Sequence, residues 1–200
     1  QTGSLISELE YLQDTEIFAD KGTKIDDLVR KGRTTIINLK GAPPDIQELI
    51  VNRLCNNLFE LRKSDKLPPM MLVVEECHIF CPQQGKASST RILRTIASEG
   101  RKFGLGMTLI SQRPAKVDKN VLSQCNTQII LKVANPNDLK AISASIEGLT
   151  DGMEAEIQRL PIGTALVTGG GASMPLFVDI RPRETKHGGE SIEVVPSKRM

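Results

Sequence analysis

Residues 70–76 have the sequence Met-Met-Leu-Val-Val-Glu-Glu, in which five apolar residues are followed by two carboxylates. A short apolar run of this kind predicts a buried strand that ends at Val74. Similar runs at Thr34–Leu39, Met107–Ile110 and Thr127–Val133 predict further strands. Strands that are apolar on both faces and that alternate with helices are typical of an α/β fold with a mainly parallel sheet.

Apolar residues at helical spacing predict helices between these strands. Asp45 stands three residues before Glu48, a carboxylate version of the capping box, and predicts a helix start there. The predicted helices are Ser4–Leu12, Asp45–Lys63, Thr90–Lys102, Pro136–Ser145 and Gly152–Leu160, and two final strands are predicted at Thr164–Thr168 and Leu176–Ile180.

The composition limits both size and function. A chain of 200 residues has the length of one domain, with at most a small appendage. Aromatic residues make up 3% of the chain, which argues against a sugar-binding groove or a base-stacking RNA platform. No apolar run is long enough to cross a membrane, and no secretory signal is found, so we expect a cytoplasmic protein without membrane contact.

The four cysteines, Cys55, Cys77, Cys81 and Cys125, are expected to be reduced, as is usual in the cytosol. Cys77-His78-x-x-Cys81 resembles half of a zinc site, but no second Cys/His pair follows it. Reduced structural thiols are therefore favoured over a metal site.

The net charge of +2 conceals a local basic block. Residues 86–140 contain ten Lys or Arg and three acids, whereas the rest of the chain has sixteen basic and twenty-one acidic residues. A basic block of this kind favours a polyanionic partner, such as nucleotide phosphates or DNA. The alternative is a solvated helix face without a ligand.

The two carboxylates after the strand are candidates for chemistry, because active sites of such folds lie at the carboxyl ends of strands. Adjacent like charges repel each other unless a cation offsets them. In phosphoryl transfer one strand-end acid holds magnesium and a neighbouring acid polarises the attacking water, which makes Glu75 and Glu76 candidates for such a pair. The alternative is a solvated strand end.

Two further residues fit phosphoryl transfer. Gln112 closes the next strand, where its amide can contact a γ-phosphate and the attacking water without adding charge; alternatively, it ties down the turn before Pro114. Arg101 lies at the end of the preceding predicted helix. It can complement the helix dipole there, or reach into the phosphate site of another subunit as an arginine finger.

Four segments in this order resemble one family: LVVEECHIF (72–80), SEGRKFGLGMTLISQRP (98–114), LSQCNTQIILKVANPND (122–138) and LPIGTALVTGGG (160–171). They are similar to the ATPase domain of archaeal HerA helicases, which belong to the HerA/FtsK group of hexameric DNA-pumping ATPases. The similarity runs from Gly32 to Arg183. It implies the C-terminal portion of a RecA-like ATPase core, a three-layer domain with a mainly parallel central sheet.

The resemblance implies roles for individual residues. Glu75 and Glu76 correspond to the Walker B acids, with Glu75 serving magnesium and Glu76 acting as catalytic base. Arg101 matches the arginine finger that is given in trans to the neighbouring protomer, and Gln112 matches the polar sensor. Many relatives in the wider group have Asp at the first acid position, so Glu75 is one methylene longer.

The resemblance also implies cofactors and partners: ATP and Mg²⁺, a homo-hexameric ring, double-stranded DNA, and a nuclease of the NurA type in DNA-end resection and recombinational repair. Two other functions stay open. One is a non-catalytic ring-assembly or scaffold domain, and the other is a related DNA pump for conjugation or chromosome segregation.

A P-loop, G-x-x-x-x-G-K-[ST], is absent from the sequence, since Gly85-Lys86 is followed by Ala87. In the family the P-loop lies upstream, across a helical insertion. We therefore expect residues 1–31 to be a remnant of that insertion, 32–183 the C-terminal part of the ATPase domain, and 184–200 a tail. Such a chain should bind ATP poorly alone, and its sheet should have an exposed apolar edge where the P-loop strand is missing.

Overall fold

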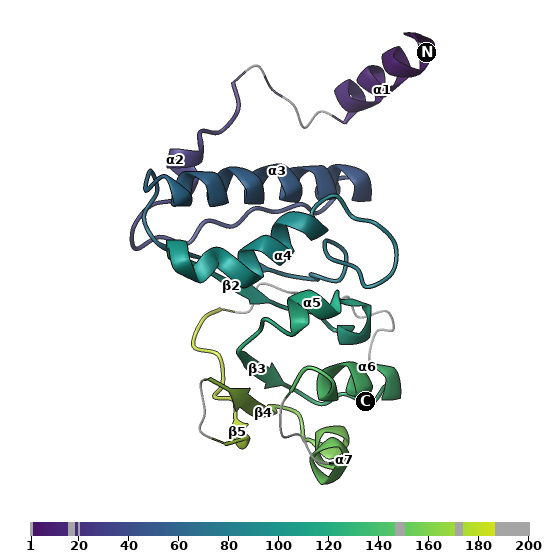
Figure 1. The fold of residues 1–200 in the computed structure, drawn as a ribbon, viewed down its shortest axis with the longest axis vertical. Coiled ribbons are helices and arrows are strands. Elements are labelled where there is room, and N and C mark those ends of the chain that lie inside the picture. Colours follow the sequence, from purple (N-terminus) through teal and green to yellow (C-terminus); the bar gives the residue numbers. More distant parts are fainter. Residues whose placement is uncertain (1, 16–18, 20, 147–150, 171–173, 187–200) are drawn as a thin grey trace, which may run out of the picture.

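The computed structural model describes residues 2–15, 19, 21–146, 151–170 and 174–186 (Figure 1). The helices are α1 (Thr2–Asp14), α2 (Ile25–Leu28), α3 (Pro44–Lys63), α4 (Thr90–Glu99), α5 (Lys119–Leu122), α6 (Pro136–Ser143) and α7 (Asp151–Arg159). The strands are β1 (Met70–Val74), β2 (Leu105–Leu109), β3 (Thr127–Ile130), β4 (Thr164–Gly169) and β5 (Leu176–Asp179), and 3₁₀ turns η1 (Gly100–Phe103) and η2 (Pro114–Lys116) flank β2. The helices predicted from apolar spacing are thus confirmed, with ends shifted by a few residues.

The first sheet is a parallel pair, as expected. β1 pairs with β2, with Met70 opposite Leu105 and Val74 opposite Leu109. The connection between them contains α4, because parallel neighbours need a crossover. The core cluster lies between this sheet and the helices α3 and α4, and its members include Cys55, Phe59, Val74, Ile92, Leu93, Ile96 and Leu105.

The prediction that β1 is buried on both faces is wrong. Side chains along a strand alternate between its faces, and the helices of the described chain cover one face of this pair. On the other face Met71 is 63% exposed and Val73 is 55% exposed. β1 therefore carries apolar side chains that the described chain leaves exposed.

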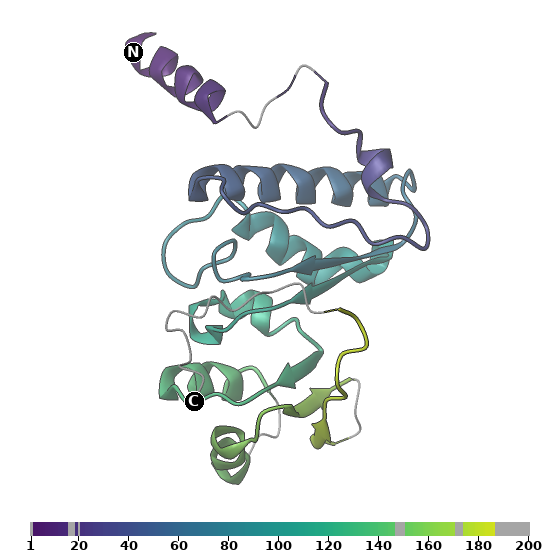
Figure 2. The ribbon, with the colours of Figure 1, turned by 180° about the vertical axis from the view of Figure 1, so that it is seen from behind.

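The prediction of a buried strand at Thr34–Leu39 is also wrong. This segment is extended but unpaired, and Ile36 is 87% exposed. It runs beside α3, as Figure 2 shows from behind. A cavity of about 1270 Å³ lies between residues 28–40, α3 and β1. The segment does not pair with β1, whose partner in the described structure is β2, and apolar sequence alone cannot make a strand without a partner.

The second sheet is antiparallel, in the order β3-β4-β5. β4 and β5 pair antiparallel, with Thr164 opposite Asp179 and Val167 opposite Leu176. α6 and α7 contribute to the core cluster at this sheet, whose buried members are Ile130, Leu139, Ile142, Ile157 and Leu166. The predicted parallel arrangement is thus found in the first sheet. β3 ends at Ile130, three residues before the predicted end at Val133.

The predicted capping box at the start of α3 is not formed. Pro43 occupies the N-cap position and Pro44 the first helical position, where the missing N–H of proline costs nothing. Asp45 accepts a hydrogen bond from the Tyr11 hydroxyl at 3.1 Å, and Glu48 accepts one from the backbone N–H of Ser88. Both carboxylates therefore tie other segments to α3.

The predicted tail, residues 184–200, falls mainly on residues 187–200, which lie outside the described residues. Among the helices that the structure describes, none has the length and apolar character needed to span a membrane.

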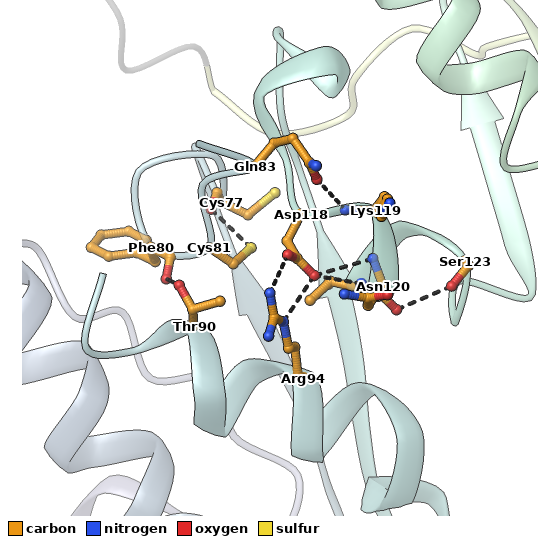
Figure 3. A network of polar contacts seen from close by, with 11 residues as sticks. Cys77, Phe80, Cys81, Gln83, Thr90, Arg94, Asp118, Lys119, Asn120 and Ser123 are labelled. Carbon is orange, nitrogen blue, oxygen red and sulfur yellow. Dashed lines mark hydrogen bonds and ion pairs between the residues drawn. The ribbon is translucent and has the colours of Figure 1, made fainter. Parts of the chain in front are cut away.

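Asp118 joins three segments next to the first sheet (Figure 3). Its carboxylate accepts hydrogen bonds from Arg94 at 3.0 and 2.6 Å and caps α5 through the N–H groups of Asn120 and Val121. Its backbone N–H donates to the carbonyl of Cys81 at 2.8 Å. Burial alone raises the pKa of Asp118, but the bonds from Arg94 and from the backbone outweigh it and lower the pKa below the usual value.

Replacing Asp118 with Ala is expected to lower the free energy of unfolding at pH 7 by about 2 kcal/mol, because a helix cap and a buried acceptor are lost while Arg94 stays hydrated. A lowered native pKa stabilises the fold above the usual carboxyl range, and this contribution disappears as the pH falls through the native pKa. Urea unfolding of the chain should therefore show a D118A penalty at pH 7 that shrinks towards pH 3. The exposed Glu99→Ala variant is the control, and an equal penalty at both pH values would contradict the assignment.

Candidate functional site

The predicted acids and the predicted sensor meet at the carboxyl edge of the first sheet. Glu75 and Glu76 follow β1, and Gln112 follows β2, which runs parallel to it. Backbone hydrogen bonds also join the segments that follow these two strands. The N–H of Ile110 donates to the carbonyl of Val74, and the N–H of Cys77 donates to the carbonyl of Ile110, both at 3.0 Å.

Glu76 has a polar partner at each carboxylate oxygen. The side-chain amide of Gln112 donates to Glu76 Oε1 at 3.2 Å, so the structure brings this predicted pair together. His78 Nδ1 lies 3.2 Å from Glu76 Oε2. Glu76 also has a φ of +47°, in the left-handed region that is uncommon for residues other than glycine. Such backbone conformations cluster at functional sites, which supports Glu76 as the central residue of this one.

Glu75 is exposed, and in the described part of the chain its carboxylate has no hydrogen bond or ion pair. Mg²⁺ in nucleotide sites usually keeps several waters and binds one or two protein carboxylates together with substrate phosphates. Among the described residues no group of three or more His, Cys, Asp or Glu side chains could hold a metal by itself. A single free carboxylate at this edge therefore fits magnesium that arrives with the nucleotide.

His78 and Ser111 are members of the site that the sequence did not reveal. His78 Nδ1 lies 3.1 Å from Ser111 Oγ, which in turn accepts a hydrogen bond from the N–H of Arg113 at 3.0 Å. In the sequence His78 suggested half a zinc site, because cysteines flank it. The position of His78 two residues after a candidate base was a signal that the two side chains could meet. Sequence alone does not show which way the ring turns.

The cysteines beside His78 are free thiols. Cys81 Sγ donates to the carbonyl of Cys77 at 3.1 Å. Hydrogen bonding with Cys81 and burial raise the pKa of the Cys77 thiol.

Arg101 lies away from the other predicted site residues. It belongs to η1, before β2, whereas Gln112 lies after β2. Five strand residues separate the two ends, a distance of about 16 Å along the sheet. Arg101 is exposed and has no ion pair in the described chain. The structure therefore does not bring Arg101 to Glu76 within one chain.

The turn that carries Arg101 is nevertheless firmly held. Arg62, a buried residue at the end of α3, donates from Nε to the carbonyl of Phe103 at 2.7 Å. The Phe103 ring meets the Phe59 ring edge to face, with centroids 5.5 Å apart. Gly104 follows with a φ of +70°, and a Cβ there would crowd Pro69 and Arg62. The backbone position of Arg101 is thus set by α3, while its side chain faces solvent.

All ten basic residues of the block at 86–140 are exposed. Arg94 is the one that forms an ion pair, with Asp118, among the residues that the structure describes. The remaining nine positive charges are accessible to a polyanion.

Known structures share this fold. The genome packaging NTPase B204 of Sulfolobus turreted icosahedral virus 2, solved with ATP-gammaS, aligns over 84% of this chain and 76% of its own with a TM-score of 0.57 and 18% identity. VirB4 of Thermoanaerobacter pseudethanolicus aligns over 76% of this chain and 41% of its own with a TM-score of 0.57 and 15% identity. The chain thus has the RecA-like α/β fold of such NTPases.

Curated sequences are more similar. The probable DNA double-strand break repair helicase HerA of Methanocaldococcus jannaschii is 40% identical over 139 residues, covering 70% of this chain and 28% of the relative. The HerA helicase of Saccharolobus solfataricus is 30% identical over 201 residues, covering 93% of this chain and 40% of the relative. The chain thus spans well under half the length of these relatives. The family model described as helicase HerA-like C-terminal matches residues 48–180, and the chain therefore belongs to the HerA-like C-terminal family.

Proposed function

We propose that this chain is the C-terminal part of the ATPase core of a HerA-type DNA helicase or translocase, with Glu76 as the catalytic base. The observation that carries this proposal is the contact between Glu76 and Gln112 at the carboxyl edge of two parallel strands. An acid and a neutral amide in this place can orient one water towards a γ-phosphate.

In this proposal Glu76 accepts the proton of the attacking water, while Gln112 orients that water or contacts the γ-phosphate. The free carboxylate of Glu75 would hold Mg²⁺, which when bound neutralises charge on the phosphate oxygens. The carboxylate of Glu75 has no partner in the described chain, whereas each oxygen of Glu76 has one, and this difference supports the two separate roles.

The phosphate-binding loop would come from polypeptide outside this chain. No segment here has the P-loop pattern, and the relatives are more than twice as long as the aligned part. β2 pairs with β1 alone in the described structure, so its second edge is open for a further strand. This open edge supports the expectation of a missing P-loop strand.

A ring is proposed because Arg101 and Glu76 lie at opposite ends of the parallel strands. If subunits contact head to tail, the strand ends near Arg101 of one subunit face the strand ends near Glu76 of the next. A closed ring then completes each site with Arg101 from a neighbour, and a homo-hexamer is the form that the family resemblance implies.

Double-stranded DNA is the proposed substrate, in DNA-end resection together with a NurA-type nuclease. The exposed basic block supports contacts to DNA phosphates, which do not depend on base sequence. A scaffold without catalysis is the alternative, but the paired Glu76 and Gln112 favour an active site.

The proposal is tested with the full-length protein and with this chain alone. We expect ATP hydrolysis by the full-length protein to be stimulated by duplexes of unrelated sequence, and the stimulation to fall steeply as salt rises. The chain alone should show no ATP binding at micromolar nucleotide in calorimetry. A full-length protein without turnover would favour the scaffold function, and micromolar ATP binding by the chain would contradict an external P-loop.

A further inference from the structure

We propose that His78 is a positioning residue for the reaction, one that holds the carboxylate of Glu76 in place and links it to the turn at Ser111–Arg113. This inference rests on the proposed role of Glu76 as the base. It assigns to the ring of His78 a task that neither the Walker B acids nor the predicted sensor performs.

The contacts of His78 place a hydrogen on Nδ1. Nδ1 lies 3.2 Å from Glu76 Oε2, and an ionised carboxylate can only accept hydrogen bonds. A lone pair on Nδ1 would repel this oxygen, so we assign the hydrogen to Nδ1, from which it is donated to Glu76. Ser111 Oγ, 3.1 Å from the same nitrogen, shares this hydrogen as a second acceptor.

The carboxylate of Glu76 needs such a partner because it has two oxygens and a free terminal rotation. Gln112 donates to Oε1 and His78 to Oε2, so each oxygen has one partner and keeps lone pairs for water. Without His78, the Oε2 side of the group is released. A base that turns away from the attacking water loses rate even when substrate binding is unchanged.

The ring of His78 is itself well held. Its side chain is 17% exposed, and the turn in which it lies is closed by the N–H of Ile79, which donates to the carbonyl of Glu76 at 2.9 Å. Through Ser111, His78 is also linked to the backbone N–H of Arg113, the residue that follows Gln112 in the chain. The base and the sensor are therefore joined by two routes, one direct and one through His78.

The decisive experiment compares two variants of the full-length protein that differ in one donor. Asn bears an N–H₂ on Cγ, at the place of His78 Nδ1, whereas Leu has the same branching with a methyl group there. We expect His78→Leu to lower kcat by about 10- to 100-fold with little change in KM for ATP. His78→Asn should retain most of the wild-type kcat, and both variants should show similar thermal unfolding.

A second arm places His78→Leu in a Glu76→Gln background. If His78 acts through Glu76, it adds no further loss there, because residues that act as one unit are not additive. Equal losses in H78N and H78L, or a full additional loss in the E76Q background, would overturn the positioning role. If E76Q alone keeps wild-type turnover, the proposed function fails first, which separates that failure from a failure of the inference on His78.

Discussion

Replacing Glu76 with Gln in the full-length protein is expected to lower ATP turnover by about 10²- to 10⁴-fold. The substitution keeps the length of the side chain, and its amide oxygen can still accept from one of the two donors, Gln112 or His78, that contact Glu76. It removes the negative charge that accepts a proton from water. Nucleotide binding should be preserved, because phosphate affinity resides mainly in the P-loop, and steady-state hydrolysis together with a separate nucleotide-binding titration measures both.

The matched control is Glu75→Gln, one residue earlier. Because Glu75 is the proposed Mg²⁺ ligand, this variant should raise the Mg²⁺ concentration needed for half-maximal turnover. Its carboxylate has no other partner in the described chain, so little else should change. An E76Q protein that hydrolyses ATP near the wild-type rate would show that Glu76 is not the base. A variant that loses nucleotide binding as well would point to a structural role of Glu76.

Replacing Arg101 with Ala is expected to lower turnover by about 10³- to 10⁵-fold, the contribution of an arginine finger. The folded chain should be unaffected, since the Arg101 side chain is exposed and the turn is held by Arg62 and Phe103. The neighbouring Lys102, also exposed, supplies the control: Lys102→Ala should keep most of the turnover.

Mixed rings distinguish a finger given in trans from one that acts within its own subunit. R101A subunits keep Glu76, and E76Q subunits keep Arg101, so some interfaces of a mixed ring contain both groups. We expect mixtures of the two inactive proteins to regain turnover in proportion to such interfaces. No recovery at any ratio, in rings shown to have exchanged subunits, would argue against Arg101 acting on its neighbour.

Much of the architecture was predictable from local sequence. β1 lies where the run at Met70–Val74 placed it, and α3 and α7 follow the apolar spacing. Parallel pairing of β1 with β2 then placed Glu76 and Gln112 at one edge, as expected for an α/β sheet. These predictions succeed because they depend on short-range periodicity and on the helical crossover that parallel neighbours require, here through α4.

The predictions that were wrong depend on partners that a sequence pattern does not contain. Thr34–Leu39 has the composition of a strand, but a strand exists only where another backbone takes up its N–H and C=O groups. Asp45 and Glu48 have capping-box spacing, but prolines begin the helix and the two carboxylates bind Tyr11 and Ser88.

The sequence by itself indicated the family, the α/β class and the candidate acids, because motif order and apolar periodicity are local properties. Only the tertiary structure decided that His78 faces Glu76 and Ser111, since the direction of a ring depends on what packs around it. It also placed Arg101 about 16 Å along the sheet from the Gln112 end, on a turn held by α3. Strand direction and packing produce that separation, and it is the physical reason why we propose that Arg101 acts on a neighbouring subunit.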